Sequence, residues 1–161
     1  MARSISIVMG SSSDLDTVQG AVDILKEFNV SFEVKILSAH RTPKELANYV
    51  ESVSKSGIKV FIAAAGGSAA LAGVIAAHTT FPVIGIPIET KSLKGLDSLL
   101  STAQMPAGIP VASMAIGKPG AKNAALFALQ VLGIDDKKIS RKLADYKKAM
   151  RQKVKKAKVR L

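Results

Sequence analysis

The stretch ISIVMGSSSD, residues 5–14, decides the fold. Its first half is a β-rich apolar run, and its second half is a glycine followed by hydroxyl and carboxylate side chains. Helical periodicity follows at once, with apolar residues recurring on one face from Leu15 to Phe28. A strand that turns through glycine and serines into a helix predicts a βα unit. Its loop is suited to an anion, because backbone N–H groups and the positive end of the helix dipole meet there.

The same alternation continues along the chain. A helix should start at Pro43 and end at Gly57, with Thr42 as its cap and Glu45 completing a capping box. Residues 117–120 should be a loop. The remaining expected strands are 32–37, 60–65, 83–88 and 111–116, and the remaining expected helices are 69–77, 96–104, 121–132 and 135–156.

This pattern predicts the fold class. Strands that alternate with helices form parallel βαβ units with right-handed crossovers. We therefore expect an α/β fold: a three-layer, flavodoxin-like parallel sheet of about five strands with helices on both faces, plus a basic C-terminal helix. A single domain is expected over residues 1–161, with residues 135–161 as the amphipathic basic helix. Ligands of such folds lie at the carboxyl ends of the strands.

Composition narrows the classes of function. The sequence has no cysteine, no apolar leader and no run long enough to span a membrane, so we expect a cytoplasmic protein. The net charge is +11, but residues 1–136 hold 11 basic and 11 acidic side chains. The whole excess lies in residues 137–161, as in a solvated helix face, so a nucleic-acid partner is not favoured. The helices at 69–77 and 121–132 have little polar surface, which predicts a homo-oligomer.

Three strand ends carry candidate site residues. After the first strand, Gly10, Ser11, Ser13 and Asp14 suit a phosphate and a sugar hydroxyl, although Ser13 or Asp14 could equally be a plain helix cap. The Gly-Lys-Ser/Thr ending of a Walker loop is missing. The other two candidate loops follow the second and third strands.

After the second strand comes SAHRTP, residues 38–43. The His40 imidazole can take and give a proton near neutral pH, and Arg41 can hold a phosphate or carboxylate through two hydrogen bonds. The alternative is a surface loop in which His40 only helps to cap the next helix. Ser38 and Ala39 are counted as substrate-binding neighbours.

After the third strand, Gly66, Gly67 and Ser68 offer backbone N–H groups to an anion, or simply allow close packing of helix on strand. Leu71 completes the substrate-binding set. His78 is interpreted as a helix-end residue, and residues 89–95 and 104–108 as a lid and an adjacent wall. With two distant histidines, no cysteine and no close cluster of carboxylates, no metal site is expected.

Taken together, five segments resemble the PurE family of purine biosynthesis, in the family's order and over nearly the whole chain. They are VMGSSSD (8–14), SAHRTP (38–43), GLDSLLS (95–101), QMPAGIPV (104–111) and NAAL (123–126).

The resemblance implies an N5-carboxyaminoimidazole ribonucleotide mutase, which moves a carboxylate from the exocyclic N5 to C4 of an imidazole ring without a cofactor. In the family's scheme CO₂ is released inside a closed site, captured by the ring carbon, and the C4 proton is then removed. By resemblance His40 carries the proton, Ser11 and Asp14 hold the ribose phosphate end, and Arg41 binds substrate. The family's octamers would also account for the apolar helices.

One segment departs from the family's mutase branch, which usually carries Gly-Gly-Ala-Ala-His-Leu-Pro-Gly after the third strand. Here the histidine is replaced by Ala70 and the proline by Ala72. The carboxylase branch, which uses free CO₂, also lacks that histidine, whereas residues 41–43 and 109–111 resemble the mutase branch. The mutase is favoured. A direct carboxylase and a non-catalytic nucleotide-binding module stay as alternatives.

Overall fold

The computed structural model describes residues 4–158 and contains one parallel sheet. Its five strands lie in the order β2-β1-β3-β4-β5. Ile5 of β1 pairs with Phe32 of β2 on one side and with Val60 of β3 on the other, so the chain reverses its winding direction at β1. The expected flavodoxin-like α/β class is confirmed. The strands are β1 (Ile5–Met9), β2 (Phe32–Ile36), β3 (Val60–Ala65), β4 (Val83–Pro87) and β5 (Ala112–Ser113).

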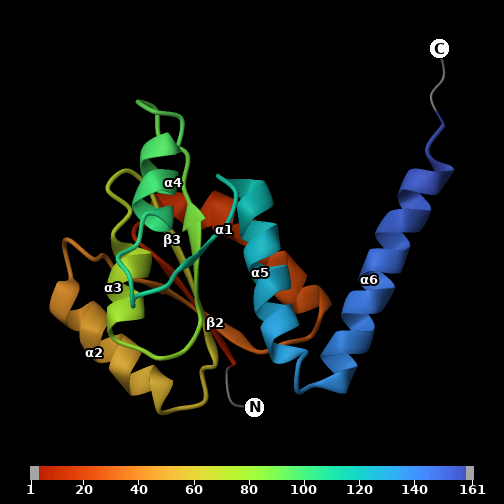
Figure 1. The fold of residues 1–161 in the computed structure, drawn as a ribbon, viewed down its shortest axis with the longest axis horizontal. Helices are drawn as coiled ribbons and strands as arrows, with labels where there is room; N and C mark the ends of the chain where they lie inside the picture. Colours follow the sequence, from red (N-terminus) through yellow and green to blue (C-terminus); the bar gives the residue numbers. More distant parts are fainter. Residues whose placement is uncertain (1–3, 159–161) are drawn as a thin grey trace.

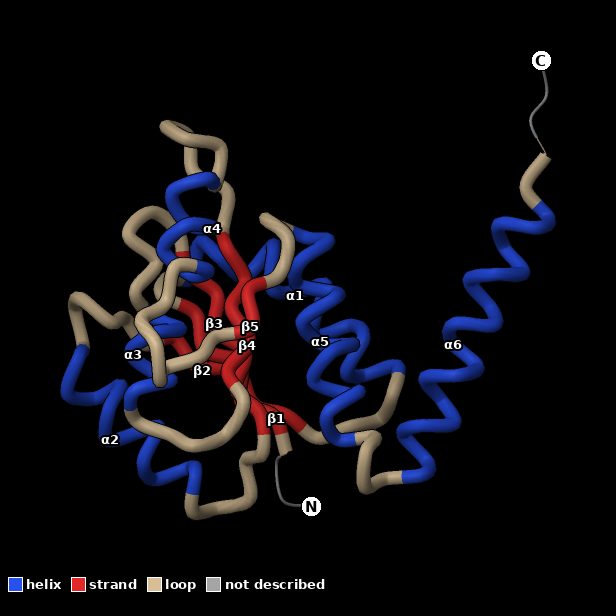
Figure 2. The backbone as a smooth tube through the Cα atoms, in the orientation of Figure 1, coloured by secondary structure: helices blue, strands red, loops and turns tan. Residues whose placement is uncertain are grey.

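Helices cover both faces of the sheet (Figures 1 and 2). One face packs against α1 and α5, and the opposite face packs against α2 and α3. A 3-10 turn, η1 (Ser12–Asp14), leads into α1. The helices are α1 (Leu15–Glu27), α2 (Pro43–Ser54), α3 (Leu71–Ala77), α4 (Leu96–Ala103), α5 (Lys118–Leu132) and α6 (Lys137–Lys156).

The central strand shows why the sheet needs both layers. All five residues of β1 are buried, and their side chains alternate between the two faces. Ile5 and Ile7 lie in the cluster under α1 and α5, whereas Val8 lies under α2 and α3. The one polar member, Ser6, is fully buried, and its hydroxyl lies 2.6 Å from the Tyr49 hydroxyl of α2. A strand buried on both faces is typical of parallel sheets.

Three local expectations are wrong. Strand β5 is only Ala112–Ser113, shorter than the expected 111–116. Helix α5 begins at Lys118, so most of the expected loop 117–120 is its first turn. Thr42 makes no side-chain cap to α2, and the expected capping box with Glu45 does not form. The Thr42 hydroxyl instead accepts from the Ser38 N–H and donates to the Ser38 carbonyl, at 2.9 and 3.1 Å.

The apolar helix α5 is covered within the chain. It packs against α1 on one side and α6 on the other, and Ala121, Ala124 and Ala128 are fully buried. In α3, Leu71 and Ile75 are buried against the sheet. The lack of polar surface on these two helices therefore has a cause inside one protomer.

Helix α6 is docked only at its beginning. Ile139, Leu143 and Tyr146 pack against the core, and the Tyr146 and Phe28 rings lie 5.8 Å apart between centroids. Beyond them, Met150 and Val154 are exposed, and the helix projects away from the body (Figure 1). Over residues 4–158, no helix combines the length and the apolar character that crossing a membrane needs.

Candidate functional site

A cavity of about 380 Å³ opens at the carboxyl ends of β1, β2 and β3. It lies where the winding of the sheet reverses between β1 and β3, the place at which ligands bind in sheets of this order. Its volume suits a small metabolite. Three loops line it, and each follows one of these strands: residues 10–14, residues 38–41 and residues 65–71.

The loop after β1 presents polar groups to one end of the cavity. Ser11 caps η1, because its hydroxyl accepts from the Ser13 N–H at 3.3 Å. The Ser13 hydroxyl donates to Ser11 Oγ at 2.8 Å and to Asp14 Oδ1 at 3.2 Å. The cavity is lined by Gly10, Ser11 and Asp14. Ser13 does not line it, but its hydroxyl contacts Ser11 and Asp14. Neither Ser13 nor Asp14 is a plain side-chain cap of α1, since α1 has none.

Asp14 is the buried carboxyl group of the site, with 8% of its surface exposed. Burial raises the pKa of Asp14, because it removes water from the charged form. The Ser13 hydroxyl, a hydrogen bond at Ser11 and the positive charge of Arg41 act in the opposite direction and do not outweigh it. The carboxylate also lines the cavity, where it can accept a further hydrogen bond from a sugar hydroxyl.

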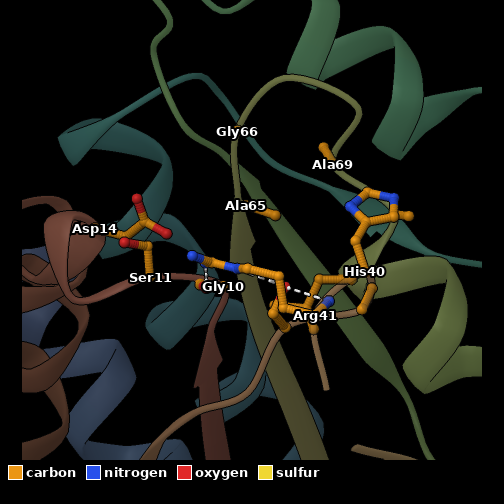
Figure 3. A pocket seen from close by; sticks show the side chains of 12 residues that line it. Gly10, Ser11, Asp14, His40, Arg41, Ala65, Gly66 and Ala69 are labelled. Carbon is orange, nitrogen blue, oxygen red and sulfur yellow. Dashed lines mark hydrogen bonds between the residues drawn. The ribbon is translucent and has the colours of Figure 1, made fainter. Parts of the chain in front are cut away.

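Arg41 and His40 are neighbours in sequence with different surroundings. The Arg41 guanidinium donates to the Gly10 carbonyl at 2.7 Å and so ties the loop after β2 to the loop after β1. Its Nε also reaches Ser38 Oγ at 3.4 Å. Figure 3 shows Arg41 extending toward Gly10, Ser11 and Asp14, while the His40 ring lies at the other end beside Ala69. His40 is exposed and lines the cavity, so its ring is accessible to a ligand.

The third wall is backbone and small side chains. Gly66 and Leu71 line it as expected, but Gly67 and Ser68 do not. Ala65, Ala69 and Ala70 line it instead, and sequence reasoning did not select them because an alanine has no functional group to attract notice. Ala70, the position at which the family's mutase branch carries histidine, is therefore in direct contact with the cavity.

Two other segments lie away from the cavity. Residues 89–95 and 104–108, expected as a lid and a wall, contribute no lining residue. The first is held down, since the Thr90 hydroxyl is within 2.8 and 3.0 Å of the Asp97 carboxylate oxygens. His78 ends α3 at the opposite edge of the sheet, and its Nδ1 lies 3.1 Å from Glu51 Oε1. No cluster of metal-ligating side chains was found among residues 4–158.

Comparisons with known proteins identify the family. The model of a family described as AIR carboxylase matches residues 4–153. A Bacillus subtilis protein named N5-carboxyaminoimidazole ribonucleotide mutase is 51% identical to this chain, over 93% of each chain. A Pyrococcus horikoshii protein of the same name is 53% identical, over 93% of this chain and 84% of its own. The Escherichia coli K12 relative of that name is 49% identical over 93% of this chain and 89% of its own. A solved Treponema denticola PurE superposes with a TM-score of 0.85 at 30% identity, over 93% of this chain and 92% of that one.

Proposed function

This chain belongs to the AIR carboxylase family and is an N5-carboxyaminoimidazole ribonucleotide mutase, and we propose that the cavity at the β1/β3 switch point is where it moves the carboxylate. One observation carries the assignment of the site. The loop after β2 brings His40 and Arg41 to the same cavity that the loop after β1 lines with Gly10, Ser11 and Asp14. A proton carrier, a cation and an anion-binding loop are the groups that this substrate requires.

The substrate is oriented by charge. Its 5′-phosphate lies at the Ser11 end, where serine hydroxyls, the start of the helix and the Arg41 guanidinium favour an anion. Asp14 then accepts a hydrogen bond from a ribose hydroxyl, because its carboxylate lines the cavity next to Ser11. The imidazole ring consequently lies between His40 and the wall formed by Ala69 and Ala70.

His40 carries the proton in both halves of the reaction. Protonated His40 donates to N5, the N5–carboxylate bond breaks, and its electrons remain on the nitrogen as CO₂ and aminoimidazole ribonucleotide form. The C4 carbon then attacks the CO₂, and the new C–C bond leaves C4 with both a proton and a carboxylate. Neutral His40 removes that proton, which restores the aromatic ring and the protonated histidine. One proton leaves His40 and one returns, so the cycle balances.

The test is His40→Asn, with His78→Asn as the matched control. Asparagine keeps polarity but cannot exchange a proton near neutral pH, so turnover of the N5-carboxylated substrate should fall by about 10²-fold or more. His78 lies at the opposite edge of the sheet, and its replacement should leave turnover unchanged. A non-catalytic nucleotide-binding module predicts instead that wild type has no turnover and that both variants bind the ribonucleotide alike.

Ala70 makes the direct carboxylase a second candidate for the chemistry. The wall facing His40 carries a methyl group where the mutase branch carries an imidazole. Supplying each substrate in turn separates the two reactions. Conversion of the N5-carboxylated substrate supports the mutase. Activity with aminoimidazole ribonucleotide plus bicarbonate, together with none on the N5-carboxylated form, would establish the carboxylase.

The protein is further proposed to work as a cytoplasmic homo-octamer. Support comes from α4, which exposes Leu96 and Leu100 on one face, with Leu93 exposed just before it. Leucines on an exposed helix face are commonly covered by another subunit. We assign no role in nucleic-acid binding to the basic helix α6.

A further inference from the structure

The loop between β3 and α3 has an unusual backbone. Gly67 has a φ of +66°, and Ala69, which has a Cβ, has a φ of +26°. A left-handed conformation is unfavourable for alanine and persists only where neighbouring groups hold it. The loop's own bond, from the Ala69 N–H to the Gly66 carbonyl, is long at 3.3 Å. Something outside the loop must therefore hold it in place.

Ser98 of α4 supplies that contact. It is fully buried, and its hydroxyl accepts from the Gly67 N–H at 2.9 Å while donating to the Ile88 carbonyl at 2.7 Å. One hydroxyl thus joins the loop after β3 to the end of β4, with both of its usual hydrogen-bonding roles filled. Ser101, one turn away, adds a weaker bond to the Gly67 carbonyl at 3.4 Å.

The held segment is the wall that faces His40. Gly67 does not line the cavity, but its neighbours Gly66, Ala69 and Ala70 do. Because the wall is backbone and methyl groups, its position depends on the backbone conformation alone. A displaced Gly67 peptide would move the surface against which the imidazole ring and the carboxyl group in transit are packed.

We propose that Ser98 is a positioning residue for the mutase reaction: by fixing the Gly67 peptide it keeps this wall closed on His40, so that CO₂ released from N5 is captured at C4 before it escapes. The proposal rests on the proposed function of the cavity. Ser98 touches no substrate and carries no proton, and it acts only through the loop. The proposal assigns a role to the first of the two serines in the GLDSLLS segment, and this serine lies outside the cavity lining.

The experiment measures how each turnover ends. The N5-carboxylated substrate is given to wild type, Ser98→Ala and Thr102→Val. Two products are then quantified, the C4-carboxylated ribonucleotide and free aminoimidazole ribonucleotide. The rate of the reaction without enzyme is subtracted from each. Ser98→Ala should lower product formation about tenfold or more and raise the fraction ending as free aminoimidazole ribonucleotide several-fold. This fraction is a property of the folded molecules, so partial unfolding does not change it.

Thr102→Val is the matched control. Thr102 is 3% exposed on the same face of α4, and its hydroxyl donates to the Ser98 carbonyl at 2.7 Å without touching the loop. Valine keeps its shape and removes the hydroxyl, so thermal stability should fall in both variants while the product ratio shifts only in Ser98→Ala. Ser98→Cys, a weaker donor and acceptor of similar size, should lie between wild type and alanine, and it takes the place of Ser98→Ala should that variant not fold.

The outcomes separate the two proposals. If wild type makes no C4-carboxylated product from the N5-carboxylated substrate, the proposed function fails. If wild type is active and Ser98→Ala, or Ser98→Cys in its place, gives the product ratio of Thr102→Val, Ser98 is only a structural residue and the positioning role is overturned.

Discussion

At the scale of single residues, Arg41 has two roles that a lysine could not fill at the same time: it holds the Gly10 carbonyl and, as proposed, it binds the phosphate. Its guanidinium donates one N–H to the Gly10 carbonyl and still has N–H donors that can hydrogen-bond to a phosphate. Arg41→Lys keeps the positive charge but loses the planar fork. We expect KM to rise about tenfold, equivalent to roughly 1.4 kcal/mol, with a smaller change in kcat. Steady-state kinetics decide it: a fall in kcat as large as the rise in KM would give Arg41 a role in the chemical step.

Asp14 is predicted to lower the stability of the folded protein at neutral pH while it contributes to substrate binding. Because burial raises its pKa, the folded protein binds the Asp14 proton more tightly than the unfolded chain does. The contribution of this group to stability therefore falls as pH rises through its folded pKa, and it is least favourable at neutral pH. Asp14→Asn should raise the Tm at pH 7, with the gain shrinking toward pH 4, while KM rises.

Melting curves at several pH values, read beside KM, provide the check. A variant with a lower Tm than wild type at pH 7 would show that the Ser13 and Arg41 contacts of Asp14 outweigh its burial. A raised Tm with an unchanged KM would leave Asp14 without a role in holding the ribose.

Sequence patterns found the polar side chains of the site and missed what supports them. His40, Arg41 and Asp14 could be selected because their groups are chemically conspicuous and follow apolar strands. Ser98 could not, since a serine in a helix is ordinarily interpreted as solvent-facing. Among the alanines of the third wall, Ala70 is marked only by its departure from the family's pattern, and Ala65 and Ala69 carry no signal. Both become visible only when the fold brings α4 and the loop after β3 together.

At the scale of elements, α4 buries polar side chains and exposes apolar ones. Ser98 and Thr102, four residues apart, face the interior, whereas Leu96 and Leu100 on the other side are about half exposed. Apolar periodicity indicates such a helix, but Leu96 and Leu100 do not face the core of the protomer. The errors at β5 and α5 have other causes. The ends of a strand depend on its pairing partners, and within residues 4–158 β5 pairs with β4 alone. Helix α5 starts earlier than expected because Pro119 is tolerated in the first turn of a helix.

The close approach of α4 to β4 gives a prediction for stability. A methyl group added at Gly85 would meet Thr102 Cγ2 well inside van der Waals contact, and Thr102 is buried and cannot move aside. Gly85→Ala should therefore destabilise the protein by about 2 kcal/mol or more. Thr102→Ser removes the obstructing methyl, so the double variant should be more stable than Gly85→Ala alone. Denaturant titrations that show simple additivity of the two changes would refute this packing argument.

At the scale of the whole molecule, the net charge is concentrated in one segment. The body to residue 136 carries no net charge, and the excess sits on α6 and the residues after it. Three of the exposed leucines, Leu93, Leu96 and Leu100, lie around α4, near the carboxyl edge of the sheet and away from α6 (Figure 1). An assembly through α4 would leave the basic helix at its periphery, where like charges on neighbouring subunits repel least.

We therefore expect light scattering on purified wild type to give eight times the chain mass. Replacing Leu96 and Leu100 together by glutamate puts two charges on the exposed face of α4, and this should dissociate the octamer because a buried, unpaired charge is costly. The variant should stay folded, since neither leucine belongs to the protomer core. Ile134→Glu, at an isolated position that is 81% exposed, is the control for added charge and should keep the mass of wild type. An intact octamer in the double variant would place the interface elsewhere, and the half-exposed leucines of α4 would then need another explanation.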